Sequence, residues 1–201
     1  MALISALMVT SLLTTLGVAL AFLMTTETLI SGNYRAGQET LYAADAGIGR
    51  VVADLRTRPD WDVVLAGVVV SGFNDGIMTP PAPDGTTVDL AQRTLRRQAE
   101  SDARHGSSAS NPNSPQWRLF AHADAWRLSS STPIATPAYI VVWVADDDDE
   151  RDGDPLADSN GVVLLRAEAF GPQGARRLVD ATVSRDALTS QVRMLAWREV
   201  R

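Results

Sequence analysis

The sequence contains no cysteine, and this absence excludes disulfide frameworks and thiolate metal sites. Histidine is almost as scarce, since His105 and His122 are the only two. Two histidines are too few for a zinc site without cysteine, and neither belongs to a metalloprotease or serine-nucleophile motif. We expect His122 to be a strand or edge residue. No convergent catalytic groups are visible, so we expect a protein without enzymatic activity.

Lysine is absent as well, and all eighteen basic residues are arginine, which we attribute to genome composition. The net charge is −6, and it is concentrated in one place. Eight acids lie between Asp146 and Asp158 beside a single base, Arg151, so this stretch carries a local charge of −7. The rest of the chain is close to neutral. A basic face for nucleic acid is not supported, and we expect no nucleic-acid partner.

Charge is also missing from the start of the sequence, where the first charged side chain is Glu27. A helix over residues 1–24 would be roughly 36 Å long, enough to cross the hydrocarbon core of a bilayer. A secretory signal peptide is the alternative, because Ala19-Leu20-Ala21 resembles a cleavage site. That alternative would require a basic stretch before the apolar run, and the run would have to be shorter. The sequence therefore favours a membrane-spanning helix.

The helical pattern continues beyond this apolar segment, because apolar and small residues recur in steps of three and four. Pro59 then ends the helix, since the residue before a proline is displaced from the α region. We predict one helix over 1–58, with an apolar half at 1–26 and an amphipathic half at 27–58. The apolar stripe of the second half consists of Ile30, Tyr34, Gly37, Leu41, Ala44, Ile48, Val52 and Leu55.

The remainder of the sequence predicts a small sheet. Region 59–137 is expected to be a variable αβ region, with a second helix at 89–105 and a strand at 117–123. Region 138–201 is expected to be an antiparallel β-meander with an acidic loop. The predicted fold class is α+β, in which the sheet and the amphipathic helix cover each other's apolar faces. The strands of the meander are expected at 138–145, 161–170, 175–185 and, from the final run, 191–201.

Two short motifs in the helix carry a family resemblance. They are Gly32-Asn33-Tyr34-Arg35 and Ala43-Ala44-Asp45-Ala46-Gly47. Together with the aliphatic start ALISALMV and the closing LAWREVR, they resemble the PilX-type minor pilins of type IV pili. The resemblance covers about the first 55 residues, and the acidic loop and hairpin extend it less tightly. It implies a type IV pilin-like fold, with a long N-terminal helix packed on a small antiparallel sheet.

The resemblance also implies a function. Such proteins are structural pilus subunits, here with a minor, tip or priming role. They are held in the inner membrane by a single span before assembly and lie in the extracellular filament or at its tip afterwards. The implied partners are other pilin subunits through the N-terminal helix, the prepilin peptidase and the pilus assembly machinery. The peptidase removes a basic leader, so Met1 would be the processed and methylated end, unless Met1 is an initiator.

One position departs from the family pattern. Most pilins carry glutamate at mature position five, where its carboxylate offsets the terminal ammonium of a neighbouring subunit inside the apolar filament core. With Met1 as the mature end, this position is Ser5. Tip-located members often lack the glutamate, so Ser5 favours a minor or tip role. Gly17 and Phe22 belong to the same expected filament-core segment.

The acidic stretch joins the two strongest strand candidates. Its carboxylates repel one another, and Ca²⁺ is the hard cation that suits such a cluster, with six to eight oxygen ligands. The stretch matches the EF-hand loop pattern in part, because Glu150 stands at the third position and Ser159 where a bidentate glutamate belongs. The alternative is a solvated acidic loop. The expected Ca²⁺ ligands are Asp148, Asp152, Asp154 and Asp158, with Asn160 as a further candidate.

Two other functions remain open at this point. The first is a membrane-anchored, calcium-dependent binding or adhesion module, in which the helix is only an anchor. The second is a type II secretion pseudopilin of the K class, which shares the missing glutamate. That class usually carries a large helical insertion, and region 59–137 is small for it.

Overall fold

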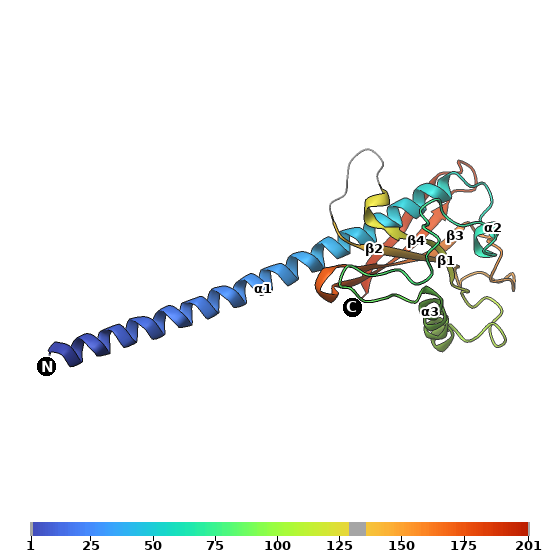
Figure 1. The fold of residues 1–201 in the computed structure, drawn as a ribbon. Coiled ribbons are helices and arrows are strands. Elements are labelled where there is room, and N and C mark those ends of the chain that lie inside the picture. The colour runs from blue at the N-terminus through green and yellow to red at the C-terminus, as the bar shows by residue number, and fades with distance from the viewer. Residues whose placement is uncertain (1, 129–135, 201) are drawn as a thin grey trace. The chain divides into compact units, whose positions relative to one another are not determined.

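The computed structural model describes residues 2–128 and 136–200, and the chain forms two compact units, Met1–Ala36 and Gly37–Arg201. One helix, α1 (Ala2–Arg56), belongs to both units (Figure 1). It ends shortly before Pro59, as the sequence predicts. The unit boundary falls later than the predicted boundary between 1–26 and 27–58, because burial along the helix begins only at Ala36. The division into four segments itself stays a prediction.

The first unit consists of a helical segment with its side chains exposed. Residues 2–31 are all exposed, and no charged side chain precedes Glu27. The hydroxyls of Thr10, Thr14 and Thr15 donate to carbonyls one turn earlier, at 3.0, 2.8 and 3.0 Å. These bonds satisfy the hydroxyls within the helix itself, so they need neither water nor a partner.

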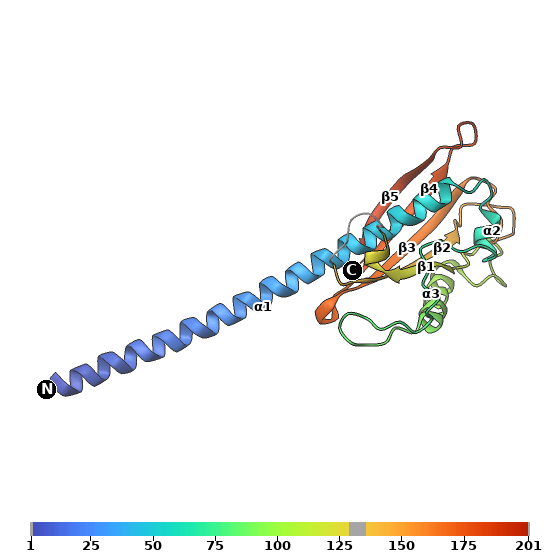
Figure 2. The same cartoon turned by 45° about the horizontal axis from the view of Figure 1, so that its top comes forward.

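The second unit is built around a five-stranded sheet. Each strand pairs antiparallel with the next, in the spatial order β1-β2-β3-β4-β5 (Figure 2). The predicted α+β, pilin-like fold is therefore confirmed, and the final run of the sequence forms the fifth strand. The strands are β1 (Arg118–Asp124), β2 (Tyr139–Asp146), β3 (Val162–Phe170), β4 (Arg176–Arg185) and β5 (Val192–Val200).

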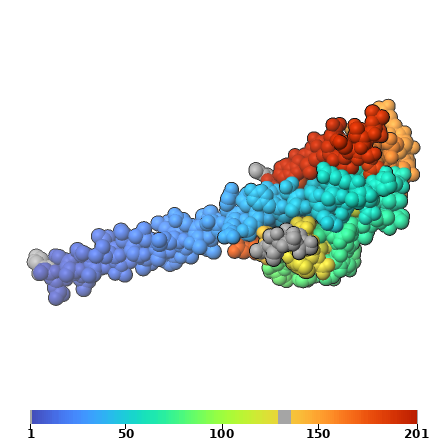
Figure 3. Space-filling view, turned by 90° about the horizontal axis from the view of Figure 1, so that it is seen from above, coloured from blue at the N-terminus to red at the C-terminus, as the bar shows by residue number. Residues whose placement is uncertain are grey.

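One face of the sheet packs against α1. The amphipathic part of the helix buries its stripe from Ala43 to Leu55 against inward-facing residues of the strands, Ile140 and Val142 among them. The short helix α2 (Asp62–Leu65) adds Val64 and Leu65 to the same core. Figure 3 shows this side, with the second half of α1 bordered by the residues of β5 in red. From Ala36 onward, the amphipathic half thus packs on the sheet as its sequence pattern predicts.

The other face of the sheet packs against α3 (Leu90–His105), which Asp89 caps by accepting a hydrogen bond from the backbone N–H of Gln92 at 2.8 Å. A second, smaller core forms there around Tyr139, Val141 and Trp143. Successive side chains of a strand point to opposite faces, and both faces are covered at β2. This strand is therefore buried along its whole length. The two cores therefore lie on opposite faces of one central strand.

Glycine sets the distance between α1 and the sheet. A Cβ atom added at Gly47 would lie 2.6 Å from the Cγ2 of Ile140, whereas one at Gly49 would meet nothing within 4 Å. We expect Gly47→Ala to lower the free energy of unfolding by about 1–3 kcal/mol through overpacking. Gly49→Ala should raise it by roughly 0.5–1 kcal/mol, because alanine is the better helix former.

Both variants are to be measured by denaturant unfolding of the full chain in detergent. The two substitutions are chemically identical and only two residues apart, so each controls for the other. Shifts of the same sign would contradict the close packing of α1 at Gly47.

Candidate functional site

The first unit offers one continuous apolar surface. Large apolar side chains are exposed along it, and Phe22 is 71% exposed. Ser5 and Gly17, which the sequence places in the same segment, are exposed as well, and Met1 lies outside the described residues. By length and composition α1 could cross a membrane, and none of its most apolar window is buried in the chain. An apolar surface of this extent requires lipid or other protein to cover it.

The second helix motif, Ala43-Ala44-Asp45-Ala46-Gly47, has a structural explanation. Ala43 and Ala44 are buried, and Gly47 allows the close approach to β2. The Oδ1 of Asp45 accepts a hydrogen bond from the indole Nε1 of Trp197 at 2.8 Å, which ties the helix to β5. The motif is therefore the docking face of α1 on its own sheet.

The first motif, Gly32-Asn33-Tyr34-Arg35, lies in the first unit and differs from the second. Tyr34 is 70% exposed, and a Cβ added at Gly32 would meet nothing within 4 Å. Ile30, which the predicted stripe includes, is also exposed. The stripe is therefore buried only after Tyr34, and its first two members, Ile30 and Tyr34, lie on the surface.

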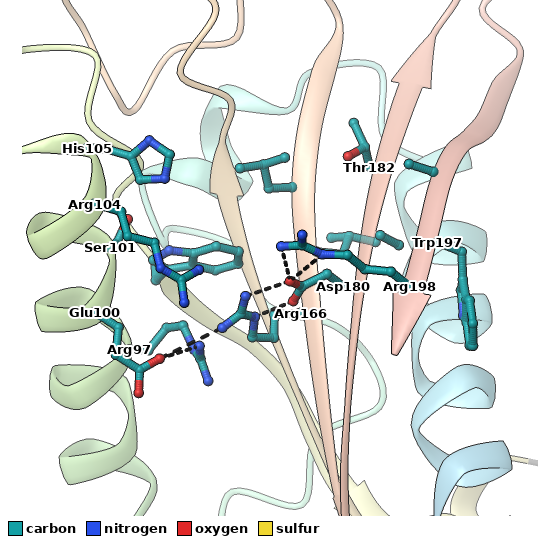
Figure 4. Close-up of a pocket in the computed structure, with 15 residues that line it drawn as sticks. Arg97, Glu100, Ser101, Arg104, His105, Arg166, Asp180, Thr182, Trp197 and Arg198 are labelled. Atoms are coloured by element: carbon teal, nitrogen blue, oxygen red, sulfur yellow. Dashed lines mark hydrogen bonds and ion pairs between the residues drawn. The ribbon is translucent and has the colours of Figure 1, made fainter. Parts of the chain in front are cut away.

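A groove lies on the α3 face of the sheet, lined by α3 on one side and by β5 on the other (Figure 4). Its volume is about 410 Å³. A row of charges crosses its floor, because Arg166, Asp180 and Arg198 are direct cross-strand neighbours on β3, β4 and β5. Asp180 accepts hydrogen bonds from both arginines, from the Nη2 of Arg166 at 2.6 Å and from the Nη2 of Arg198 at 2.9 Å. This row was not predicted, because cross-strand register is not visible in the sequence.

His122 is buried in β1, where its Nδ1 lies 3.0 Å from the hydroxyl of Tyr139 and 3.2 Å from the Oδ1 of Asp75. Burial lowers the pKa of His122, against the opposing effect of Asp75. The Tyr139 hydroxyl donates to the same carboxylate at 3.1 Å. Asp75 belongs to the chain segment 71–75, which runs along β1 and bonds to its backbone through Ser71 and Asp75. The three side chains therefore hold this segment on the edge of the sheet.

The acidic loop runs from Asp147 to Gly161 and joins β2 to β3. Three of its predicted ligands make bonds to separate neighbours. The Oδ2 of Asp148 lies 2.6 Å from the Nδ1 of His105 on α3. The carboxylates of Asp152 and Asp154 accept from backbone N–H groups two residues later, at 3.1 and 3.0 Å. These bonds are those of ordinary turns and of one contact with α3.

The other two predicted ligands lie near the end of the loop. The Oδ1 of Asp158 accepts from the backbone N–H of Gly161 at 2.6 Å, and the amide Nδ2 of Asn160 donates to the Oδ1 of Asp147 at 2.9 Å. Among the described residues the four predicted aspartates do not form a group of converging carboxylates. The five-residue ligand set itself stays a prediction.

The structure instead brings together three acids that the sequence analysis did not select. Ligand oxygens of Asp146, Asp147 and Glu150 all lie within 4.8 Å of one another, and all three residues are buried. Burial raises the pKa of Asp146 to about 8, and the nearby Glu150 adds to this effect. Burial also raises the pKa of Asp147. Strand alternation was the available signal, since Asp146 follows Val142 and Val144 on the inward face of β2.

Comparison with known proteins identifies only the first part of the chain. Residues 1–48 match a family described as PilX N-terminal, which covers both helix motifs. The resemblance to PilX-type minor pilins is therefore confirmed over these residues. No match was found among curated proteins or among solved structures.

Proposed function

From the match of residues 1–48 to the PilX N-terminal family, we propose that this protein is a minor subunit of a type IV pilus, at the tip of the fibre or in its priming complex. The matched segment and the fold together support a type IV pilin-like pilus component. The minor, tip or priming role is the finer part of the proposal.

The observation that carries the proposal is the exposed apolar surface of residues 2–31. Burying apolar surface contributes roughly 25 cal/mol per Å², so a helix of this kind is stable only where lipid or other helices surround it. Inner-membrane lipid would cover it before assembly, and the helices of other pilin subunits would cover it in the filament. The sheet unit, whose own core is complete without this segment, would then face the outside.

Ser5 supports the finer role. With Met1 as the mature end, Ser5 stands at position five, where most pilins carry glutamate. A subunit without that carboxylate offers no partner for the terminal ammonium of the next subunit. Such a subunit is best suited to an end of the fibre, where no neighbour requires that pairing. Cleavage by the prepilin peptidase and methylation at Met1 belong to the same proposal.

The test is quantitative mass spectrometry of filaments sheared from the source cells, together with deletion of the gene. We expect trace amounts of this chain, an N-terminal peptide beginning with methylated Met1, and few or no fibres after deletion. A chain that dominates the filament would overturn the minor role and make it the main subunit. Normal fibres that lack the chain would overturn the proposal altogether.

A membrane-anchored binding module is the second candidate, and the groove on the α3 face is the observation that favours it. In that case α1 would serve only as an anchor. Replacing residues 2–26 with an unrelated membrane span would then preserve function, whereas a pilus subunit would lose it.

A further inference from the structure

The three buried acids at the start of the acidic loop lie where the last residue of β2 meets the first turn of the loop. Asp146 is the final residue of β2 and pairs with Val163 of β3, so the ladder fixes its position. The exposed fractions of Asp146, Asp147 and Glu150 are 2%, 7% and 5%. Like charges at this spacing and burial repel strongly unless a proton or a cation compensates them.

One oxygen of Asp146 provides a second, independent observation at this cluster. Its Oδ1 is buried and has no hydrogen-bond partner. Buried polar atoms are nearly always paired, and an unpaired carboxylate oxygen is among the most costly exceptions. Within the described residues no ion pair reaches any of the three carboxylates, and the one base of the loop, Arg151, is exposed.

The other two carboxylates are held in place by the end of the loop. Glu150 accepts hydrogen bonds from the backbone N–H groups of Ser159 and Asn160 and from the hydroxyl of Ser159. The Ser159 N–H also bonds to the second oxygen of Glu150 at 3.1 Å, so each oxygen accepts two hydrogen bonds and the carboxylate is held in one orientation. Asp147 accepts the side-chain amide of Asn160 on Oδ1. The cluster is therefore held by the end of the loop, and the Oδ1 of Asp146 is its buried acceptor without a partner.

We propose that Asp146, Asp147 and Glu150 form a binding site for a divalent cation, Ca²⁺, at the base of the acidic loop. Ca²⁺ takes six to eight oxygen ligands at about 2.3–2.6 Å, so three oxygens within 4.8 Å of one another can bind one ion together. Mg²⁺ needs a near-ideal octahedron at about 2.0–2.1 Å and gives up its waters reluctantly, so a site built from several protein carboxylates suits Ca²⁺ better. Water would supply the remaining ligands.

This site differs from the set expected from the sequence, because none of the five residues of that set is among the three acids. Among those five residues, only Asn160 bonds directly to the cluster, through Asp147. A bound ion would join the end of β2 to Glu150, which is hydrogen-bonded to Ser159 and Asn160 just before β3. It would hold the loop closed at its base, and the proposal does not depend on the role of the protein in a pilus.

The first measurement is thermal unfolding and calcium titration calorimetry of the full-length protein in detergent, after removal of divalent ions with a chelator. At Ca²⁺ a hundred times above Kd, we expect the Tm to rise by about 5–10 °C. Mg²⁺ at the same ionic strength should give a much smaller shift. Equal shifts with both ions would indicate screening of the loop charge and would overturn the proposal, as would no binding at millimolar Ca²⁺.

The second measurement compares matched variants. Asp146→Asn keeps the shape of the side chain and gives the neighbouring carboxylates an amide donor, so it should be at least as stable as the native chain without calcium. Its affinity for Ca²⁺ should fall at least tenfold. Asp152→Asn, an exposed residue of the same loop with the same change in charge, should bind Ca²⁺ like the native chain. If Asp152→Asn abolishes binding and Asp146→Asn keeps it, the ion lies in the outer loop and the proposal is wrong.

Discussion

Replacing Trp143 with alanine is expected to lower the free energy of unfolding by about 3–5 kcal/mol. The side chain is fully buried in β2, on the face that α3 covers. Its indole Nε1 donates to the hydroxyl of Thr94 at 2.8 Å, and the guanidinium of Arg97 lies 5.9 Å from its ring. The truncation would leave a large cavity and remove both contacts with α3, while the ion pair of Arg93 with Glu168 would remain between the helix and the sheet.

Denaturant unfolding of the full chain, followed by circular dichroism, measures this loss. The matched control is Trp126→Ala, because Trp126 is 56% exposed and its removal should change stability by about 0.5 kcal/mol or less. A loss below about 1 kcal/mol for Trp143→Ala would show that α3 is not held on the sheet by this residue.

The second large effect is expected on assembly, when an arginine is placed in the middle of the apolar half of α1. Leu13→Arg puts a charge among residues that the proposed function surrounds with lipid and then with other helices. The cost of arginine at the centre of a membrane helix, relative to leucine, is about 3–4 kcal/mol. We expect the amount of this chain in sheared filaments to fall at least tenfold.

Quantitative mass spectrometry of the filament and membrane fractions tests this expectation. Leu95→Arg is the matched control, since Leu95 is 71% exposed on α3 and arginine there meets only solvent. It should enter filaments at the native level. Equal incorporation of both variants would show that the apolar surface of the first unit is not buried in the fibre.

The sequence predicts much of the fold because its strongest signals are local. The single helix, its end before Pro59 and the strands of the meander all follow from periodicity and breakers, and the structure confirms them. Local patterns suffice where each element meets its neighbour through one regular face.

The sequence is less informative where burial depends on tertiary contacts. His122 was expected to be a strand or edge residue. It does lie in β1, but the segment that covers it, 71–75, comes from a turn-rich stretch with no strand signal. Ile30 continues the apolar periodicity of α1 without being buried, since the sheet unit begins only after it.

The acidic loop shows the same limit. Comparison with a known loop pattern drew attention to Asp148, Asp152 and Asp154, whose side chains bond to α3 or form turns. The acids that converge include Asp146, which belongs to a strand and points inward with its neighbours. A loop pattern describes the residues of one chain segment. The cluster of three acids depends also on where β2 ends, which the pattern does not include.

The segment along β1 has a consequence for how this sheet meets other chains. Residues 71–75 occupy part of the backbone hydrogen-bonding edge of β1, through Ser71 and Asp75. Within the described part of the chain, β5 pairs only with β4, so its outer N–H and C=O groups face no strand. The two margins of the sheet are thus unequal, and an incoming strand would find an open row of donors and acceptors at β5 and a partly occupied one at β1.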